Sequence, residues 1–105
     1  HYGSYAFDAT DKVLADLAKA AKKVGKLLDK KLGDVGRTGM MFEGYGVDHL
    51  HAKLFPMHGI SAKNWKPRAS RVNKYFRKYA GYISSHDCKR ADDAKLAKLA
   101  RKIKK

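Results

Sequence analysis

The sequence predicts an α+β fold in which a long amphipathic helix packs on an antiparallel β-hairpin or meander, followed by a helical C-terminal tail. Two periodicities lead to this prediction. Apolar residues recur every three or four positions near the N-terminus, and they alternate with polar residues in the middle of the chain. A length of 105 residues limits the chain to one domain, because so short a chain buries only about two-thirds of its unfolded surface.

The first helix is expected over residues 10–32. Asp8 and Thr10 are both candidate N-caps, because their side-chain oxygens can accept a hydrogen bond from the first helical turn. The apolar positions that follow share one helix face: Leu14, Leu17, Ala21, Val24 and Leu28. Gly33 is expected to end the helix in the left-handed conformation that glycine adopts most easily.

The hairpin is expected from two short segments separated by a glycine-containing turn at residues 44–46. Residues 37–43 hold a short apolar run bounded by glycines, which is typical of a strand. Residues 47–55 alternate in polarity, so His49, His51, Lys53 and Phe55 are predicted to share one face. Pro56 is expected to end this strand, because proline cannot donate to the ladder.

Two further helices are expected in the C-terminal part of the chain. Residues 69–79 are compatible with a short helix, whereas residues 92–103 show a clearer pattern, with Leu96, Leu99 and Ile103 on one stripe. The basic residues that end the chain suit the negative end of a helix dipole.

The composition points to anionic partners. Lysine and arginine number 24 against 10 aspartate and glutamate residues, which gives a formal net charge of +14. Such an excess attracts phosphate-bearing ligands in general, so nucleotides and nucleic acid are both possible partners. Aromatic and basic residues also interleave over residues 65–79, which is compatible either with stacking on bases or with a solvated basic surface.

The single cysteine, Cys88, cannot form an internal disulfide, so a reducing compartment is the simplest expectation. The apolar runs are too short to cross a bilayer, and the N-terminal residues have no secretory signal pattern. The sequence therefore predicts a soluble cytoplasmic protein with no membrane partner.

The predicted second strand carries three nitrogen groups in a row, from His49, His51 and Lys53. A neutral imidazole can attack phosphorus near neutral pH, and a neighbouring lysine can neutralise a phosphate oxygen. Two other interpretations remain open. The row can be the polar outer face of a sheet, or His49 and His51 can combine with His58 as three imidazole ligands of zinc.

The segment 39–56, with its central His49-Leu50-His51-Ala52-Lys53, closely resembles the signature strand pair of the histidine-triad (HIT) family. The family signature is His-x-His-x-His followed by two apolar residues, and Lys53 stands in the third histidine position. The preceding long helix and the segments 79–85 and 90–93 are also similar to family members of a bacterial branch. The resemblance thus covers most of the chain.

The resemblance implies a nucleotide hydrolase or transferase that cleaves at the α-phosphate through a nucleotidyl-histidine intermediate. It implies His51 as the nucleophile, His49 as its support and Lys53 as a stabiliser of charge. Backbone N–H groups in the turn are implied to hold phosphate oxygens, those of Gly44, Gly46 and Val47. It also implies a nucleotide or nucleotide-conjugate substrate, no cofactor, no metal and a homodimer.

On this basis residues 1–105 are expected to form one HIT-like domain, with the core in residues 1–59 and a basic C-terminal extension in residues 60–105. The first strands of the family have no counterpart before His1, so the domain is expected to be incomplete at its N-terminus. The alternative function is a basic nucleotide- or nucleic-acid-binding protein that uses a degenerate HIT scaffold without catalysis.

Overall fold

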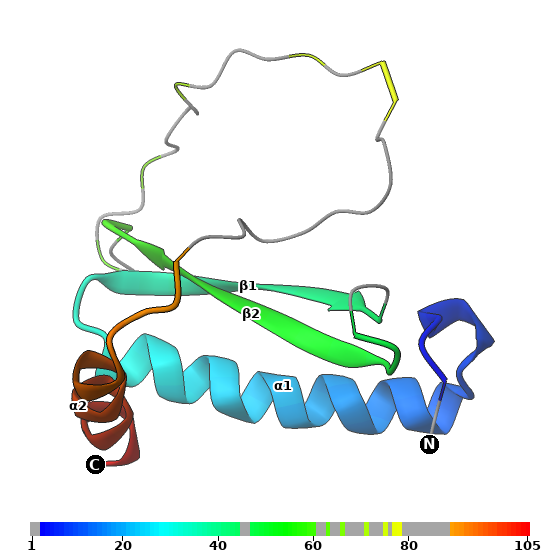
Figure 1. Ribbon diagram of the computed structural model, residues 1–105, viewed down its shortest axis with the longest axis horizontal. Helices are drawn as coiled ribbons and strands as arrows, with labels where there is room; N and C mark the ends of the chain where they lie inside the picture. Colours follow the sequence, from blue (N-terminus) through cyan, green and yellow to red (C-terminus); the bar gives the residue numbers. More distant parts are fainter. Residues whose placement is uncertain are drawn as a thin grey trace.

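The computed structural model describes residues 3–44, 47–60 and 89–105, together with Lys63, Lys66, Arg71, Tyr75, Arg77 and Lys78. The elements follow in the order η1 (Ala6–Asp8), α1 (Asp11–Lys31), β1 (Val35–Glu43), β2 (His51–His58) and α2 (Asp93–Lys104). Figure 1 shows the β1–β2 hairpin lying along α1, with α2 beside the C-terminal end of that helix. The predicted α+β class, with a long helix, an antiparallel strand pair and a C-terminal helix, is confirmed.

Helix α1 begins where the sequence predicts. The Thr10 hydroxyl accepts a hydrogen bond from the backbone N–H of Val13 at 3.2 Å, so Thr10 and not Asp8 is the N-cap. At the other end Leu32 turns directly into extended backbone, with φ −101°. The expected left-handed stop at Gly33 is wrong, because Gly33 does not have a positive φ and the chain leaves the helix one residue earlier.

Strands β1 and β2 form a two-stranded antiparallel sheet among the described residues. Strand β1 begins two residues before the predicted start, and β2 begins at His51, four residues after its predicted start. The prediction that Pro56 ends the strand is wrong: Pro56 pairs with Thr38 inside β2, which continues to His58. A proline is tolerated here because an edge strand can turn its nitrogen away from the ladder.

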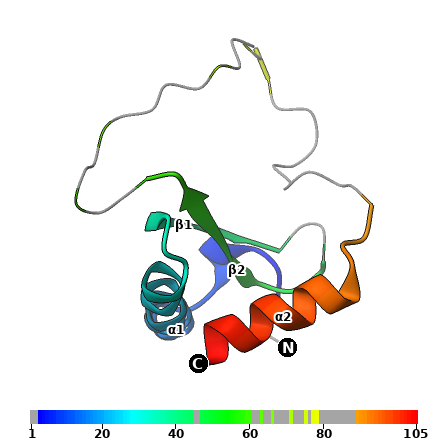
Figure 2. The ribbon, with the colours of Figure 1, turned by 90° about the vertical axis from the view of Figure 1, so that its left-hand side faces the viewer.

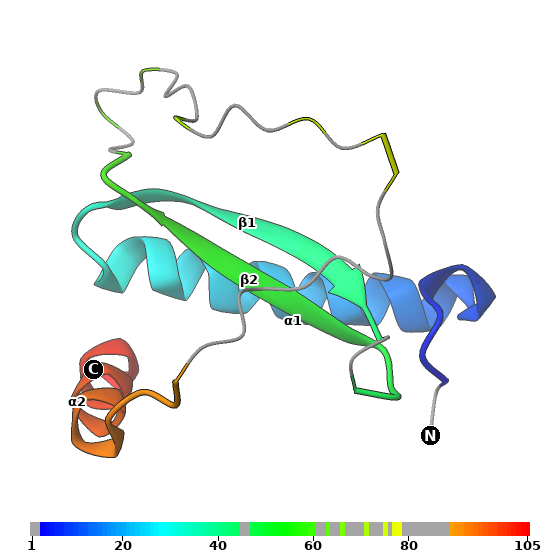
Figure 3. The same ribbon diagram turned by 45° about the horizontal axis from the view of Figure 1, so that its top comes forward.

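Helix α1 covers one face of the hairpin. The Thr38 hydroxyl of β1 donates to Asp29 Oδ1 of α1 at 2.6 Å, and Ala21 on α1 is buried. Figure 3 shows the hairpin crossing over α1 on this side. Because directly paired residues point to the same face of a sheet, Glu43 and its partner His51 lie on the opposite face from Thr38.

Helix α2 confirms the predicted helix over residues 92–103 to within one residue. The Asp92 carboxylate caps it by accepting the backbone N–H of Lys95 at 2.9 Å. Figure 2 shows α2 beside the end of α1, and all of its residues except Ile103 are exposed. The short helix predicted over residues 69–79 lies outside the described residues. Of the helices in the described ranges, none has the length and apolar character needed to cross a membrane.

Candidate functional site

Four polar side chains meet at the end of the hairpin, where β1 stops and β2 starts. We call Glu43, His49, His51 and Lys53 the Glu43 cluster. Oε1 of Glu43 lies 2.7 Å from Nε2 of His51 and 3.1 Å from Nζ of Lys53. One carboxylate oxygen therefore bridges a histidine and a lysine two residues apart on the neighbouring strand.

The Glu43 cluster is shielded but not closed. The side chain of Glu43 is 12% exposed, and those of His51 and Lys53 are 26% and 24% exposed. Partial removal from water strengthens the attraction between these charges relative to a surface pair. The remaining exposure leaves the two nitrogen groups within reach of a small anion.

His51 is held from both ring nitrogens. Its Nδ1 lies 2.9 Å from the backbone carbonyl oxygen of His49, and the two imidazole rings are 5.4 Å apart. A carbonyl oxygen only accepts hydrogen bonds, so Nδ1 carries a proton. In a neutral imidazole the lone pair is therefore on Nε2.

The contact between His51 and Glu43 determines how many protons the two side chains hold together. With Nδ1 protonated, the 2.7 Å contact between Nε2 and Oε1 needs one further proton, which sits on either the imidazole or the carboxyl group. The pair is therefore an imidazolium with a carboxylate, or a neutral imidazole with a carboxylic acid. In both forms the Nε2 lone pair becomes free only when Glu43 moves away from it.

His49 does not lie on the strand, which corrects the expected row of three side chains. Residues 47–49 form a bend, and the His49 N–H donates to the carbonyl of Val47 at 2.7 Å instead of pairing with β1. His51 and Lys53 share a strand face as predicted. His49 still lies beside His51, because its carbonyl reaches the ring from the preceding bend.

Two of the three residues predicted to bind phosphate, Gly44 and Val47, lie in or near the chain reversal. Gly44 is buried, and a Cβ there would meet the Ser4 carbonyl and lie 2.8 Å from the His49 carbonyl oxygen, so close packing of backbone requires glycine. Val47 is exposed, and its carbonyl accepts from His49. Gly46 lies outside the described residues. Phosphate binding by these backbone N–H groups stays a prediction.

A hollow of about 440 Å³ opens beside the Glu43 cluster. Its lining residues include three aromatic residues, Tyr5, Phe7 and Phe42, together with Glu43 and Gly44. The rings of Tyr5 and Phe7 stack edge to face, with centroids 5.3 Å apart. An apolar hollow that ends at a charged cluster suits a ligand with a flat ring and an anionic group.

His58 lies at the far end of β2 and takes part in a different pair. Its Nδ1 is 3.0 Å from the carboxylate of Asp34, and this hydrogen bond lowers the pKa of Asp34. Within the ranges that the structure describes, no three histidine, cysteine, aspartate or glutamate residues group so that they could hold a metal. The zinc site considered for His49, His51 and His58 therefore does not form.

Glu43 is the member of the cluster that the sequence reading missed. It is the only glutamate in the chain, and it ends an otherwise apolar strand segment just before the turn. Antiparallel pairing brings the end of one strand opposite the start of the next, so this position had to face the histidine segment. That signal identifies Glu43 once the hairpin is predicted.

A scan against models of protein families finds no match for this chain, and comparisons with curated proteins and with solved structures find none either.

Proposed function

We propose that the protein is a nucleotide hydrolase or nucleotidyl transferase of the histidine-triad type, with His51 as its nucleophile. The observation that carries the proposal is the orientation of the His51 ring. Nδ1 donates to the His49 carbonyl at 2.9 Å, which directs Nε2 toward the space shared with Lys53. The resemblance of segment 39–56 to the histidine-triad signature supports the same residue.

Substrate binding begins with displacement of Glu43. Its Oε1 bridges His51 and Lys53 at 2.7 and 3.1 Å, and a nonbridging phosphate oxygen is also an anionic acceptor of the right size for this position. When phosphate takes the place of the carboxylate, Glu43 leaves as the carboxylic acid with the shared proton, so that His51 is neutral and its Nε2 faces phosphorus while Lys53 neutralises the phosphate. Glu43 then acts as a competitor that fills the anion position of the empty site.

The reaction proceeds in two displacements. The Nε2 lone pair of neutral His51 forms a bond to the α-phosphorus, and the bond from phosphorus to the leaving group breaks with its electron pair, which takes a proton from solvent. The imidazole keeps its Nδ1 proton and gains positive charge, which the His49 carbonyl stabilises. Water then attacks phosphorus, the N–P bond breaks, and Nε2 regains its lone pair. An acceptor alcohol or phosphate in place of water gives transfer.

The nucleotide moiety has a place next to the reacting groups. Glu43 belongs both to the cluster and to the lining of the hollow with Tyr5, Phe7 and Phe42, so a base bound in the hollow lies at the same end of the hairpin as His51. Aromatic side chains stack on any base, which favours a nucleotide over a simple phosphate ester. Lys53 acts as a point charge that neutralises phosphate and not as a proton relay.

The test is direct detection of the intermediate. The protein is incubated with an adenosine phosphoramidate or a dinucleoside polyphosphate and quenched in alkali, and the adduct is sought by intact-mass and peptide mass spectrometry. We expect an adenylyl adduct on His51 in the wild type and none in His51→Ala. His58→Ala is the matched control, because His58 lies on the same strand but pairs with Asp34. Turnover that survives His51→Ala contradicts the proposal.

A further inference from the structure

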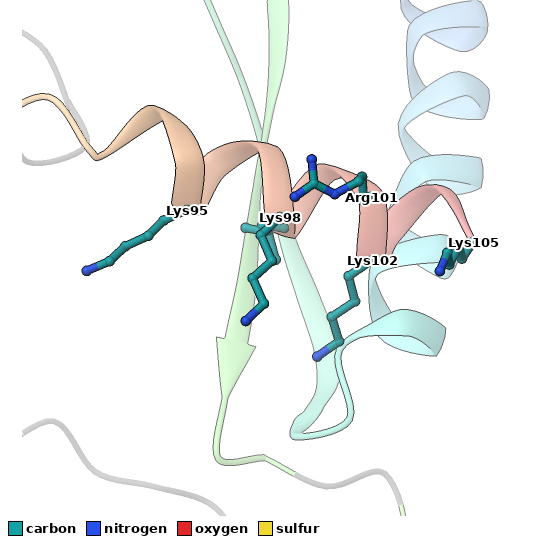
Figure 4. A pocket seen from close by; sticks show the side chains of 6 residues that line it. Lys95, Lys98, Arg101, Lys102 and Lys105 are labelled. Carbon is teal, nitrogen blue, oxygen red and sulfur yellow. The ribbon is translucent and has the colours of Figure 1, made fainter.

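A cationic surface lies on α2, away from the Glu43 cluster. A hollow of about 590 Å³ runs along one side of this helix, and five of its six lining residues are basic. The lining residues are Lys95, Lys98, Leu99, Arg101, Lys102 and Lys105. We call this surface the α2 groove. Figure 4 shows Lys95, Lys98 and Lys102 extending to the same side of α2.

The spacing of these residues explains why they gather on one side. The four lysines are successively three or four positions apart, which is the distance at which helix side chains become neighbours: Lys95, Lys98, Lys102 and Lys105. The acidic residues of the same segment, Asp92 and Asp93, are at the opposite end and are already engaged. Asp92 caps the helix and Asp93 pairs with Arg90 at 2.7 Å. Along the rest of α2 the cations have no acidic neighbour on their own helix.

We propose that the α2 groove binds the phosphate backbone of a nucleic acid without reading its sequence. The five cations span residues 95–105, which is ten steps or about 15 Å along a helix axis. One strand of B-form DNA presents a phosphate about every 3.4 Å of duplex axis, so about four phosphates fall within this length. The number and spacing of the cations therefore match a short stretch of backbone.

The composition of α2 favours nucleic acid over an anionic membrane. A helix that lies on a membrane inserts a broad apolar face, commonly with aromatic residues, while its cations contact the headgroups. Helix α2 has no aromatic residue, and its large apolar side chains, those of Leu96, Leu99 and Ile103, form a narrow stripe and not a broad face. The cations of the α2 groove therefore suit a phosphate backbone better than a lipid surface.

The experiment measures binding of a fluorescently labelled duplex DNA of arbitrary sequence to the full chain over a range of salt concentrations. The variant Lys98→Gln/Lys102→Gln removes two groove charges, and glutamine keeps a similar helix propensity. We expect the slope of log K against log salt to become shallower by about 2, since each phosphate contact contributes about one unit. Circular dichroism checks that the helical content is retained.

The chain offers a matched control on α1. Lys19 and Lys23 have the same four-residue spacing and are exposed, so Lys19→Gln/Lys23→Gln removes the same charge from a different helix. We expect its slope to stay close to that of the wild type. The charge-conserving variant Lys98→Arg/Lys102→Arg should bind the duplex as the wild type does, and His51→Ala should as well, because the groove acts independently of the proposed catalytic site.

Three results overturn the proposal. The first is an equal change of slope in the two glutamine variants, which assigns binding to overall charge. The second is absence of duplex binding by the wild type at low salt. The third is that Lys98→Gln/Lys102→Gln loses binding to phosphatidylserine vesicles but binds the duplex as the wild type does. This result assigns the surface to a membrane.

Discussion

At the scale of single residues, Glu43 has two opposed effects. Its carboxylate satisfies His51 and Lys53 in a partly shielded place, which stabilises the empty protein. In the proposed reaction the same oxygen occupies the position that a phosphate oxygen needs. A variant that keeps the shape of the side chain and removes its charge separates the two effects.

We expect Glu43→Gln to lower the free energy of unfolding by about 1–3 kcal/mol, because charge-assisted hydrogen bonds to two cationic groups are weakened. The same change should tighten the binding of AMP, since the competing carboxylate is gone. Urea denaturation and titration calorimetry measure the two quantities. Asp48→Asn is the control, because it removes one negative charge from an exposed position near the cluster. Weaker AMP binding in Glu43→Gln contradicts the competitor role.

The sequence predicts which residues of the site are neighbours on one strand better than which residues meet across two strands. Residues two apart on a strand share a face, so the neighbourhood of His51 and Lys53 followed from alternation alone. Glu43 comes from the other strand, and its pairing with His51 depends on the register of the hairpin. His49 left the strand because its N–H bonds to Val47, a local bend that alternating polarity does not reveal.

At the scale of elements, the N-cap of α1 gives a direct test of the fold. Thr10 accepts the Val13 N–H at 3.2 Å, and loss of such a cap exposes a backbone donor without a partner. We expect Thr10→Ala to lower the free energy of unfolding by about 1 kcal/mol, as measured by urea denaturation. Thr10→Ser keeps a capping hydroxyl and should have nearly the stability of the wild type. Lys19→Ala, at an exposed position inside α1, is the control for helix substitution. An equal loss in Thr10→Ser argues against capping.

Helices were predicted more closely than strands in this chain, for a physical reason. The N-terminal ends of α1 and α2 are set by local chemistry, namely the Thr10 and Asp92 caps. The ends of β2 are set by its partner: strand pairing carries the ladder past Pro56, because β1 begins early enough to reach it.

At the scale of the whole molecule, the formal charge of +14 opposes folding. Like charges repel more strongly in the compact state than in the extended chain, and every carboxylate that takes up a proton raises the net charge further. The few acidic residues that hold two segments together therefore matter for acid stability. Asp34 is one of them, because it joins the turn after α1 to His58 at the end of β2.

The pH dependence of the Asp34 contribution follows from the sign of its shift. The hydrogen bond from His58 holds the pKa of Asp34 below its ordinary value of 3.8. The folded state then binds fewer protons than the unfolded state, so this stabilisation is complete above about pH 5 and is lost as the pH falls through the lower, folded value. Both side chains are more than half exposed, so the effect is small.

We therefore expect Asp34→Asn to unfold at a lower temperature than the wild type at pH 6, and the difference to shrink steadily as the pH is lowered toward 3. Thermal unfolding followed by circular dichroism at constant ionic strength measures both curves. Asp48→Asn removes the same charge from an exposed bend and controls for net charge. An unfolding-temperature difference between Asp34→Asn and the wild type that is unchanged from pH 6 to pH 3 contradicts this prediction. In that case the bond to His58 does not couple the protonation of Asp34 to folding, and overall charge alone accounts for the loss of stability in acid.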